Sequence, residues 1–159
     1  MKCTSPRTLN PHELRGGVTL EFALLLVPLL FIAFGVIEYS RALHQYNALV
    51  KSVRDAARYI AQRNPAESTT YSSALDDTRC LAVHGNTECA GPALVPGLTT
   101  DMVSITPVSA ATAEGTAIAL VEVRIRGYSF AFAFNPLKLA GDNATVLLFG
   151  DIRAAMRQI

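Results

Sequence analysis

The chain has 159 residues, of which 50% are hydrophobic, and a formal net charge of +1. This length is enough for one modest domain and one membrane segment, and it excludes a multidomain enzyme. Lys and Arg are mixed with Asp and Glu along the polar part of the chain. Because no basic stripe is available to neutralise phosphates, nucleic acid is not an expected partner.

The N-terminus is a short polar leader followed by a long apolar segment. Residues 1–15 contain two prolines and three basic residues, which predicts a disordered cytoplasmic leader. From Phe22 to Ile37 every residue is apolar, Pro or Gly. With residues 17–21 added, the segment has the length that a helix needs to cross the hydrocarbon layer. We therefore predict one membrane-spanning helix.

The same helix is predicted to continue beyond the membrane. Pro28 removes a backbone donor inside it, which predicts a kink or a locally melted turn near residues 24–28. Asn64-Pro65 supplies a stop signal, so the helix should run from Val18 to Arg63. Its outer part carries one apolar stripe at spacings of three and four, formed by Tyr39, Leu43, Tyr46, Val50, Val53, Ala57 and Ile60. This stripe must pack against another part of the fold.

Residues 64–100 are rich in Ser, Thr, Gly, Pro and Asp and are predicted to form a long exposed connection. Cys80 and Cys89 lie close together within it and are interpreted as a disulfide, which would require an oxidising compartment. Two unpaired thiols are the alternative. A zinc site that adds His84 and Glu88 is a weaker one, because the spacing matches no standard zinc motif.

Residues 101–159 are predicted to form a small sheet. Val121, Val123 and Ile125 alternate with charged residues, which is typical of a strand with one buried face. After Gly127 the alternation changes phase, which predicts a bulge or tight bend there. The apolar residues that then share a face are Tyr128, Phe130, Phe132 and Phe134. A weaker strand covers residues 102–107, and a last one has its apolar face at Val146, Leu148, Ile152, Ala154 and Met156.

The string Arg15-Gly16-Gly17-Val18-Thr19-Leu20-Glu21-Phe22 joins the leader to the apolar segment. It resembles a prepilin peptidase site of the type IV pilin superfamily, which implies cleavage after Gly16 and retention of the helix as the new N-terminus. A carboxylate within a membrane segment costs about 2.5–3.5 kcal/mol at the bilayer centre and less near its edge. Because of this cost, we expect Glu21 to have a function. We interpret it as an assembly carboxylate that pairs with the Gly17 amino terminus of a neighbouring subunit. Solvation of Glu21 by headgroups is the alternative.

Other motifs narrow the resemblance to the TadE-like family, pseudopilins of the tight-adherence (Tad/Flp) pilus. In the helix these motifs are Gly35-Val36-Ile37-Glu38-Tyr39-Ser40-Arg41-Ala42, Tyr46-Asn47-Ala48 and Val53-Arg54-Asp55-Ala56-Ala57-Arg58-Tyr59. Near the C-terminus they are Val121 to Tyr128, Phe134-Asn135-Pro136-Leu137 and Ala154-Ala155-Met156-Arg157. Residues 64–115 match no family that we recognise. The Gly-Val-Thr-Leu that precedes Glu21 also departs from the Ala-rich stretch common in this family.

This resemblance implies an α+β, pilin-like fold in which a long N-terminal helix, transmembrane then amphipathic, packs on a small C-terminal antiparallel sheet. It implies a minor pilin or pseudopilin of a Tad-type (type IVc) pilus used in surface adherence or secretion. The expected partners are other pilin and pseudopilin subunits, the inner-membrane assembly platform, prepilin peptidase and the lipid bilayer. The expected location is the bacterial inner membrane, with a single pass, the C-terminus in the periplasm, and incorporation in an extracellular pilus as a further state.

The predicted organisation has five parts: leader 1–16, transmembrane helix 17–37, outer helix 38–63, disulfide-pinned loop 64–100 and sheet region 101–159. No catalytic activity, cofactor or metal is expected, because the histidines are scattered and the loop serines lack a neighbouring base. Basic residues flank both sides of the membrane segment, so charge alone leaves the orientation nearly balanced.

Two other functions stay open. In the first, the chain is a secreted periplasmic binding protein whose signal peptide is cut after Ala33-Phe34-Gly35, so that Val36 begins the mature chain. Glu21 and the merging of the apolar run into the outer helix disfavour that reading. In the second, it is a membrane-anchored accessory protein that never enters a filament.

Overall fold

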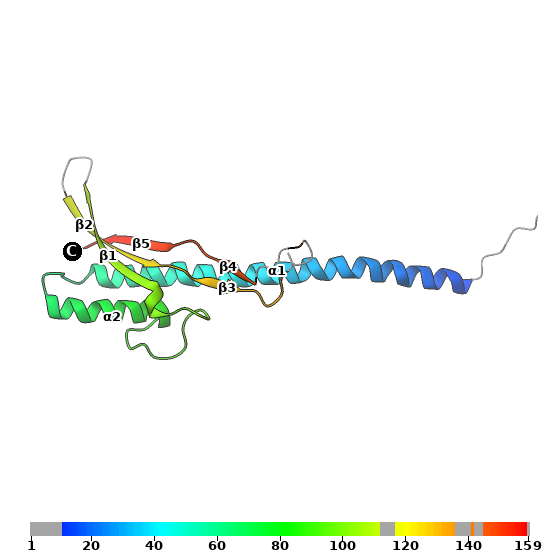
Figure 1. The fold of residues 1–159 in the computed structure, drawn as a ribbon, viewed down its shortest axis with the longest axis horizontal. Coiled ribbons are helices and arrows are strands. Elements are labelled where there is room, and N and C mark those ends of the chain that lie inside the picture. Colours follow the sequence, from blue (N-terminus) through cyan, green and yellow to red (C-terminus); the bar gives the residue numbers. More distant parts are fainter. Residues whose placement is uncertain (1–10, 112–116, 136–140, 142–144, 159) are drawn as a thin grey trace, which may run out of the picture.

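The computed structural model describes residues 11–111, 117–135, 141 and 145–158, which form one long helix with a small domain on its C-terminal part (Figure 1). Helix α1 (Pro11–Ala61) has 51 residues and is therefore about 76 Å long. It confirms the predicted long helix, but it begins inside the predicted disordered leader. The disorder prediction is therefore wrong from residue 11 onward, because a proline fits the first turn of a helix, where its missing donor is not needed.

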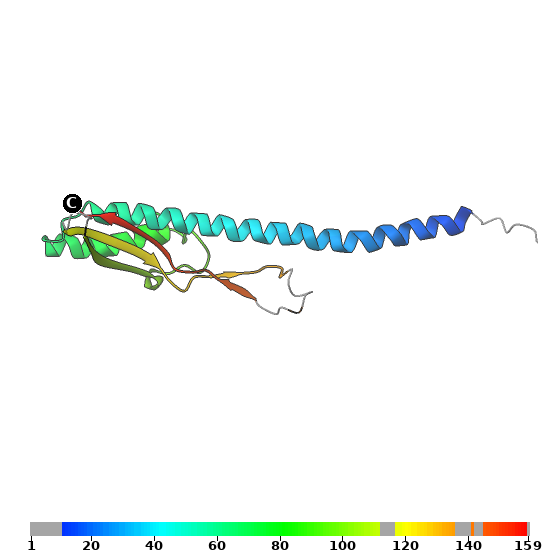
Figure 2. The same cartoon turned by 90° about the horizontal axis from the view of Figure 1, so that it is seen from above.

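Pro28 lies inside α1 without ending it. The residues on both sides of Pro28 are helical, so the locally melted turn predicted near residues 24–28 does not form. A proline removes one hydrogen bond of the ladder, and the neighbouring turns hold the helix across that gap. Figure 2 shows α1 as a gently curved rod rather than two separate rods. The kink predicted near residues 24–28 stays a prediction.

A second helix replaces the first half of the predicted loop. Helix α2 (Ser68–His84) lies alongside the outer part of α1 (Figure 1) and ends at Gly85, whose φ of 75° forms a left-handed cap. Ala74, Thr78 and Ala82 recur every four residues and are buried in the contact. The loop prediction is wrong here, because this stripe consists of small side chains and gives only a weak apolar pattern among Ser and Thr.

A three-stranded antiparallel sheet packs on the outer part of α1 and also contacts α2 through its first strand. Its first strand follows a 3-10 turn, η1 (Thr100–Met102), and the strand order is β1-β2-β5. Its strands are β1 (Val103–Ala111), β2 (Ala117–Ile125) and β5 (Ile152–Arg157). The predicted strand at 121–126 is thus confirmed, and the weaker one at 102–107 is longer than predicted. The α+β, pilin-like class predicted from the sequence is also confirmed.

The last predicted strand is split between two sheets. Strand β4 (Val146–Leu148) pairs with β3 (Ser129–Ala131) in a separate two-stranded sheet, whereas β5 pairs with β2. Gly127, with a φ of 69°, separates β2 from β3 and so confirms the predicted bend. In Figure 2 the β3–β4 pair extends from the domain in the direction of the N-terminal half of α1.

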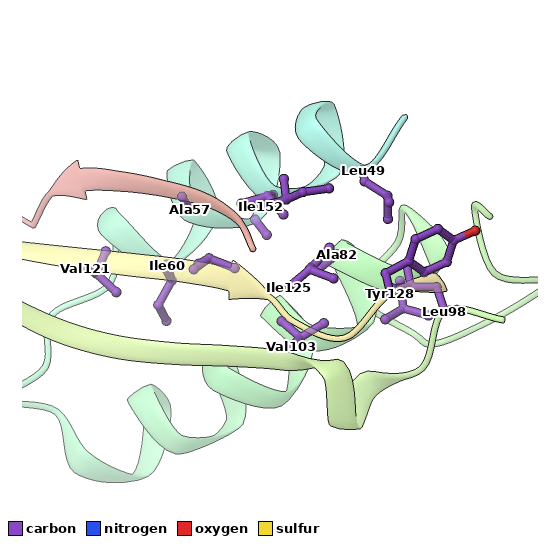
Figure 3. Close-up of a cluster of buried hydrophobic side chains, with 14 of the residues drawn as sticks. Leu49, Ala57, Ile60, Ala82, Leu98, Val103, Val121, Ile125, Tyr128 and Ile152 are labelled. Carbon is purple, nitrogen blue, oxygen red and sulfur yellow. The ribbon is translucent and has the colours of Figure 1, made fainter. Parts of the chain in front are cut away.

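The core lies between α1, α2 and the inner face of the three-stranded sheet (Figure 3). Val121, Val123 and Ile125 of β2 are buried there, as their alternation predicts. Helix α1 contributes a face on which Leu49, Val53, Ala57 and Ile60 have no exposed surface. The packing of this face fixes the domain on the outer helix and leaves the N-terminal half of α1 bare.

Candidate functional site

The N-terminal half of α1 is an apolar surface that the domain leaves uncovered. Among the described residues this is the one helix long and apolar enough to cross a membrane, and its most apolar window, with a mean hydropathy of 2.6, is 0% buried. The large exposed side chains include Val18, Leu20, Phe22, Leu24, Leu25, Leu29, Ile32 and Val36. Such a continuous apolar surface is not stable in water, so it marks a membrane or protein contact.

Glu21 is the exposed carboxylate on this surface. Within the described part of the chain it has no hydrogen-bond or ion-pair partner. The predicted cleavage residues Arg15, Gly16 and Gly17 lie one to two turns before it, in the same helix. A Cβ atom placed on Gly17 would meet nothing within 4 Å, so close packing inside one chain does not require this glycine. The role of these three residues in cleavage, and that of Glu21 in assembly, stay predictions.

The cysteine prediction is confirmed. Cys80 of α2 and Cys89 form a disulfide with a Cα–Cα distance of 4.7 Å. Asn86 orders the intervening turn, because its side-chain amide donates to the Ala90 carbonyl and its oxygen accepts from the backbone N–H groups of Glu88 and Ala90. The alternative zinc site loses its two thiolate ligands to the disulfide. Among the described residues there is no group of three or more His, Cys, Asp or Glu side chains that could hold a metal ion.

A half-buried ion pair, which sequence reasoning missed, lies where α1 meets the segment that follows β3. Glu38 is only 4% exposed, and both its carboxylate oxygens accept from the Arg41 guanidinium, at 2.8 and 2.9 Å. The backbone N–H of Ala133 donates to the same carboxylate at 3.3 Å. The sequence feature that could have predicted this ion pair is a glutamate directly after the apolar run, with an arginine three residues later. We call these three residues the clasp.

Aromatic side chains extend the contact from the clasp toward the N-terminus of α1. The Arg41 guanidinium lies 5.4 Å from the ring centre of Phe130. Further along, the ring of Phe134 lies 5.7 Å from that of Phe31 and 5.2 Å from that of Phe34. Phe134 also borders an apolar hollow of about 190 Å³ between itself and α1. The segment after β3 therefore reaches into the predicted transmembrane part of the helix.

The polar side chains of α2 serve local structure. The hydroxyls of Ser72 and Ser73 donate to carbonyls of their own helix, those of Thr69 and Thr70. Asp77 accepts a hydrogen bond from Tyr59 of α1, and a second aspartate on α2 pairs with the arginine three residues later. None of these contacts combines a nucleophile with a base, so the described part of α2 offers no catalytic arrangement.

Comparison with known proteins identifies the helix. Residues 16–58 match the model of the family described as TadE-like protein. The matched segment begins at Gly16 and covers the bare half of α1 together with most of the half that carries the domain. Neither the curated proteins nor the solved structures contain a match to the chain. The resemblance seen in the sequence is therefore confirmed: this chain carries a TadE-like segment at residues 16–58.

Proposed function

We propose that this protein is a minor pilin or pseudopilin that takes part in the assembly of a Tad-type (type IVc) pilus used in surface adherence or secretion. The observation that carries the proposal is the bare apolar half of α1, with Glu21 near its start, inside the TadE-like segment. The three-stranded sheet and α2 pack on the other half of the helix, and of the described residues Phe134 reaches back to Phe31 and Phe34 (Figure 1). A subunit built in this way can stay in the bilayer before assembly and offer the same apolar surface to sister helices afterwards.

The positions of Glu21 and Gly17 suggest how register between subunits would be set. The two residues are four apart on one helix, so they share a face and differ in height by about 6 Å. If cleavage after Gly16 makes Gly17 the new amino terminus, a neighbour displaced by about 6 Å along the helix axis would bring its amino group level with Glu21. The ion pair would neutralise a charge that has no partner in the described part of the chain.

The proposed location is the bacterial inner membrane, with one pass over residues 17–37 and the C-terminus in the periplasm. The Cys80–Cys89 disulfide supports this orientation, because the periplasm is oxidising and the cytosol is not. Prepilin peptidase, the inner-membrane assembly platform and other pilin subunits are then the expected partners. None of these roles calls for catalysis by this chain, which agrees with the non-enzymatic character of pilin-like families.

The contacts of Phe134 argue that the apolar helix is retained in the mature protein. Cleavage before Val36, as for a secreted protein, would remove both phenylalanine rings on which Phe134 packs. N-terminal sequencing of the mature chain tests this step. We expect Gly17 as the first residue, whereas Val36 would indicate a secreted protein and Met1 an uncut signal anchor.

The variant Glu21→Gln tests the assembly role. We expect it to insert and to be cleaved normally, because the substitution removes a charge and keeps the size of the side chain. Recovery in the sheared pilus fraction should fall about tenfold if the pair contributes about 1.4 kcal/mol to co-assembly. Glu67→Gln, at an exposed carboxylate before α2 that forms no capping bond, is the matched control. Equal recovery of the two variants would contradict the proposal.

A further inference from the structure

The bond between Gly16 and Gly17, which is cut in the proposed function, lies inside helix α1. The helix begins at Pro11 and is continuous to Ala61 (Figure 1), so its first turn precedes Gly16. In an α-helix each carbonyl oxygen accepts a hydrogen bond from the N–H group four residues later, which for Gly16 is that of Leu20. The carbonyl group of the bond to be cut is therefore part of the hydrogen-bond ladder of the helix.

A peptide bond in this state is a poor substrate for a peptidase. During hydrolysis the carbonyl oxygen becomes an oxyanion, and the enzyme stabilises it with hydrogen-bond donors of its own. The oxygen of Gly16 cannot point at those donors while it accepts a hydrogen bond from its own helix. Cleavage therefore requires that the turn around the Gly16–Gly17 bond be unwound first.

Residues 16–19 form a turn whose sequence favours unwinding, and we call them the weak turn. Their sequence is Gly-Gly-Val-Thr. Glycine destabilises a helix interior more than any residue except proline, and the β-branched Val and Thr are poorer helix formers than Ala, Leu or Glu. By contrast, residues 13–15 are Glu-Leu-Arg and residues 23–26 are Ala-Leu-Leu-Leu, which are strong helix formers. Between these two segments, the helix is easiest to unwind at the weak turn.

Packing inside the chain does not explain the glycine at position 17. A Cβ atom placed on Gly17 would meet nothing within 4 Å, so an alanine would fit there. The next side chain, Val18, is 67% exposed, so burial does little to hold the turn in place. Because an alanine would stabilise the helix without a clash, we expect this glycine to have a function that depends on a weak helix.

The weak turn also lies where a membrane helix can unwind. Inside the hydrocarbon layer every backbone N–H and C=O group must keep a partner within the protein, so a lipid-exposed helix stays wound there. The predicted membrane segment begins at residue 17, which places the weak turn at the cytoplasmic surface of the bilayer. Water at this surface can bond the backbone groups that unwinding releases, while the apolar run from Phe22 onward stays helical.

We propose that the weak turn opens to present the Gly16–Gly17 bond to prepilin peptidase, and that Gly17 is the positioning residue that sets how often it opens. Hydrolysis then adds one water molecule across the bond, which leaves a carboxylate on Gly16 and an amino group on Gly17. This inference rests on the cleavage in the proposed function. It goes beyond that cleavage because it assigns Gly17 to the unwinding of the backbone, rather than to the fit of a small residue in the peptidase.

Two substitutions at Gly17 separate unwinding from fit, because they rank in opposite orders. Alanine is the smaller side chain and the best helix former, whereas asparagine is larger and a poor helix former. The full uncleaved chain in detergent would be incubated with a purified prepilin peptidase, and the cleaved product would be measured by mass spectrometry. Gly150→Ala is the matched control, since it lies outside the helices and a Cβ atom there also meets nothing within 4 Å.

We expect Gly17→Ala to be cleaved about four- to fivefold more slowly than the parent, which corresponds to the difference of about 0.8–1.0 kcal/mol in helix propensity between the two residues. Gly17→Asn should be cleaved at a rate between those of Gly17→Ala and the parent, and Gly150→Ala at the parent rate. If fit in the peptidase controlled the rate, Gly17→Asn would instead be the slowest variant.

Hydrogen exchange of the Leu20 amide in the uncleaved chain, without peptidase, measures the opening directly. Gly17→Ala should slow this exchange by the same factor as cleavage, and a fit effect would leave it unchanged. Unchanged exchange, cleavage of Gly17→Ala at the parent rate, or slower cleavage of Gly17→Asn than of Gly17→Ala would each overturn the role of the weak turn and leave the cleavage itself in place. A parent chain that is not cut after Gly16 would overturn the proposed processing, and this inference with it.

Discussion

At the scale of single residues, the domain is joined to α1 by polar contacts between segments far apart in the chain. The buried hydroxyl of Tyr128 hydrogen-bonds the side-chain oxygen of Gln45 at 2.8 Å and the carbonyl of Pro96 at 3.0 Å, and it shares its one hydrogen between them. Desolvation by burial raises the pKa of Tyr128 above its ordinary value. This residue therefore holds the helix, the loop before β1 and the start of β3 together.

The variant Tyr128→Phe should lower the free energy of unfolding by about 1–2 kcal/mol, because two buried acceptors lose their donor. Since the folded-state pKa is raised, the unfolded chain releases the Tyr128 proton first as pH increases. The contribution of Tyr128 is therefore complete below about pH 10 and is lost as the pH rises above that value. Urea unfolding of the full chain at neutral and alkaline pH would measure both effects.

Tyr39→Phe is the matched control for this change, since Tyr39 is 70% exposed. We expect it to leave the free energy of unfolding within about 0.5 kcal/mol of the parent. The alkaline loss of stability should be smaller in Tyr128→Phe than in the parent or the control. Identical pH profiles of all three proteins would show that ionisation of Tyr128 is not coupled to folding.

The sequence could predict only those site residues that can be recognised from their neighbours in the chain. Glu21 is conspicuous within an apolar run, and the two cysteines of the disulfide are nine residues apart. Glu38 is different. Its burial depends on Ala133, which is 95 positions later in the chain, so only the fold distinguishes it from a solvated glutamate at the end of a membrane helix.

At the scale of elements, the strength of the side-chain pattern decided which predictions succeeded. From Val121 onward, strand β2 alternates apolar and charged residues, and this part was predicted, whereas its apolar first part, Ala117 to Leu120, was not. Helix α2 was missed because its buried stripe is made of Ala and Thr. The break between β4 and β5 was missed because Val146, Leu148 and Ile152 keep the same parity across Phe149, Gly150 and Asp151. Only the partner strands, β3 and β2, show that two sheets share this stretch.

Removal of the disulfide should affect the loop after α2 more than α2 itself. We expect the double variant Cys80→Ser with Cys89→Ser to lose about 2–3 kcal/mol of unfolding free energy, because the bond closes a short loop in the unfolded chain. Helix α2 should persist, since Ala74, Thr78 and Ala82 still pack in the core. Urea unfolding and far-ultraviolet circular dichroism of the native state would measure the two effects.

Cys3→Ser is the control for the disulfide variant, because Cys3 is the remaining cysteine of the chain and takes no part in the bond. Both variants are compared in the uncleaved chain, since cleavage after Gly16 would remove Cys3. Cys3→Ser should leave the unfolding curve unchanged. If the double variant instead loses the helical signal of α2 in the native state, then the disulfide, rather than the core contact, is what keeps this segment folded.

At the scale of the whole molecule, the apolar stripe of the outer helix has a part that the domain buries and a part that stays exposed. The predicted stripe runs from Tyr39 to Ile60, but the domain buries only its C-terminal part, from Val53 onward, completely. Tyr39, Leu43 and Tyr46 remain exposed beyond the bare membrane half. The surface available to sister helices is therefore continuous from the start of the membrane segment to about Tyr46, and the domain closes it above that point.

This division makes crosslinking a test of filament incorporation against a solitary membrane-anchored accessory protein. A photoreactive phenylalanine analogue at Tyr39 should crosslink the protein to other pilin subunits in cells that assemble pili, because neighbouring helices would cover that position. The same analogue at Val53, which has no exposed surface, should crosslink within the chain only. Crosslinks to pilins from Tyr39 that disappear in Glu21→Gln would connect the stripe to the assembly carboxylate. Crosslinks from Tyr39 to lipid alone, in cells with assembled pili, would instead place the protein outside the filament.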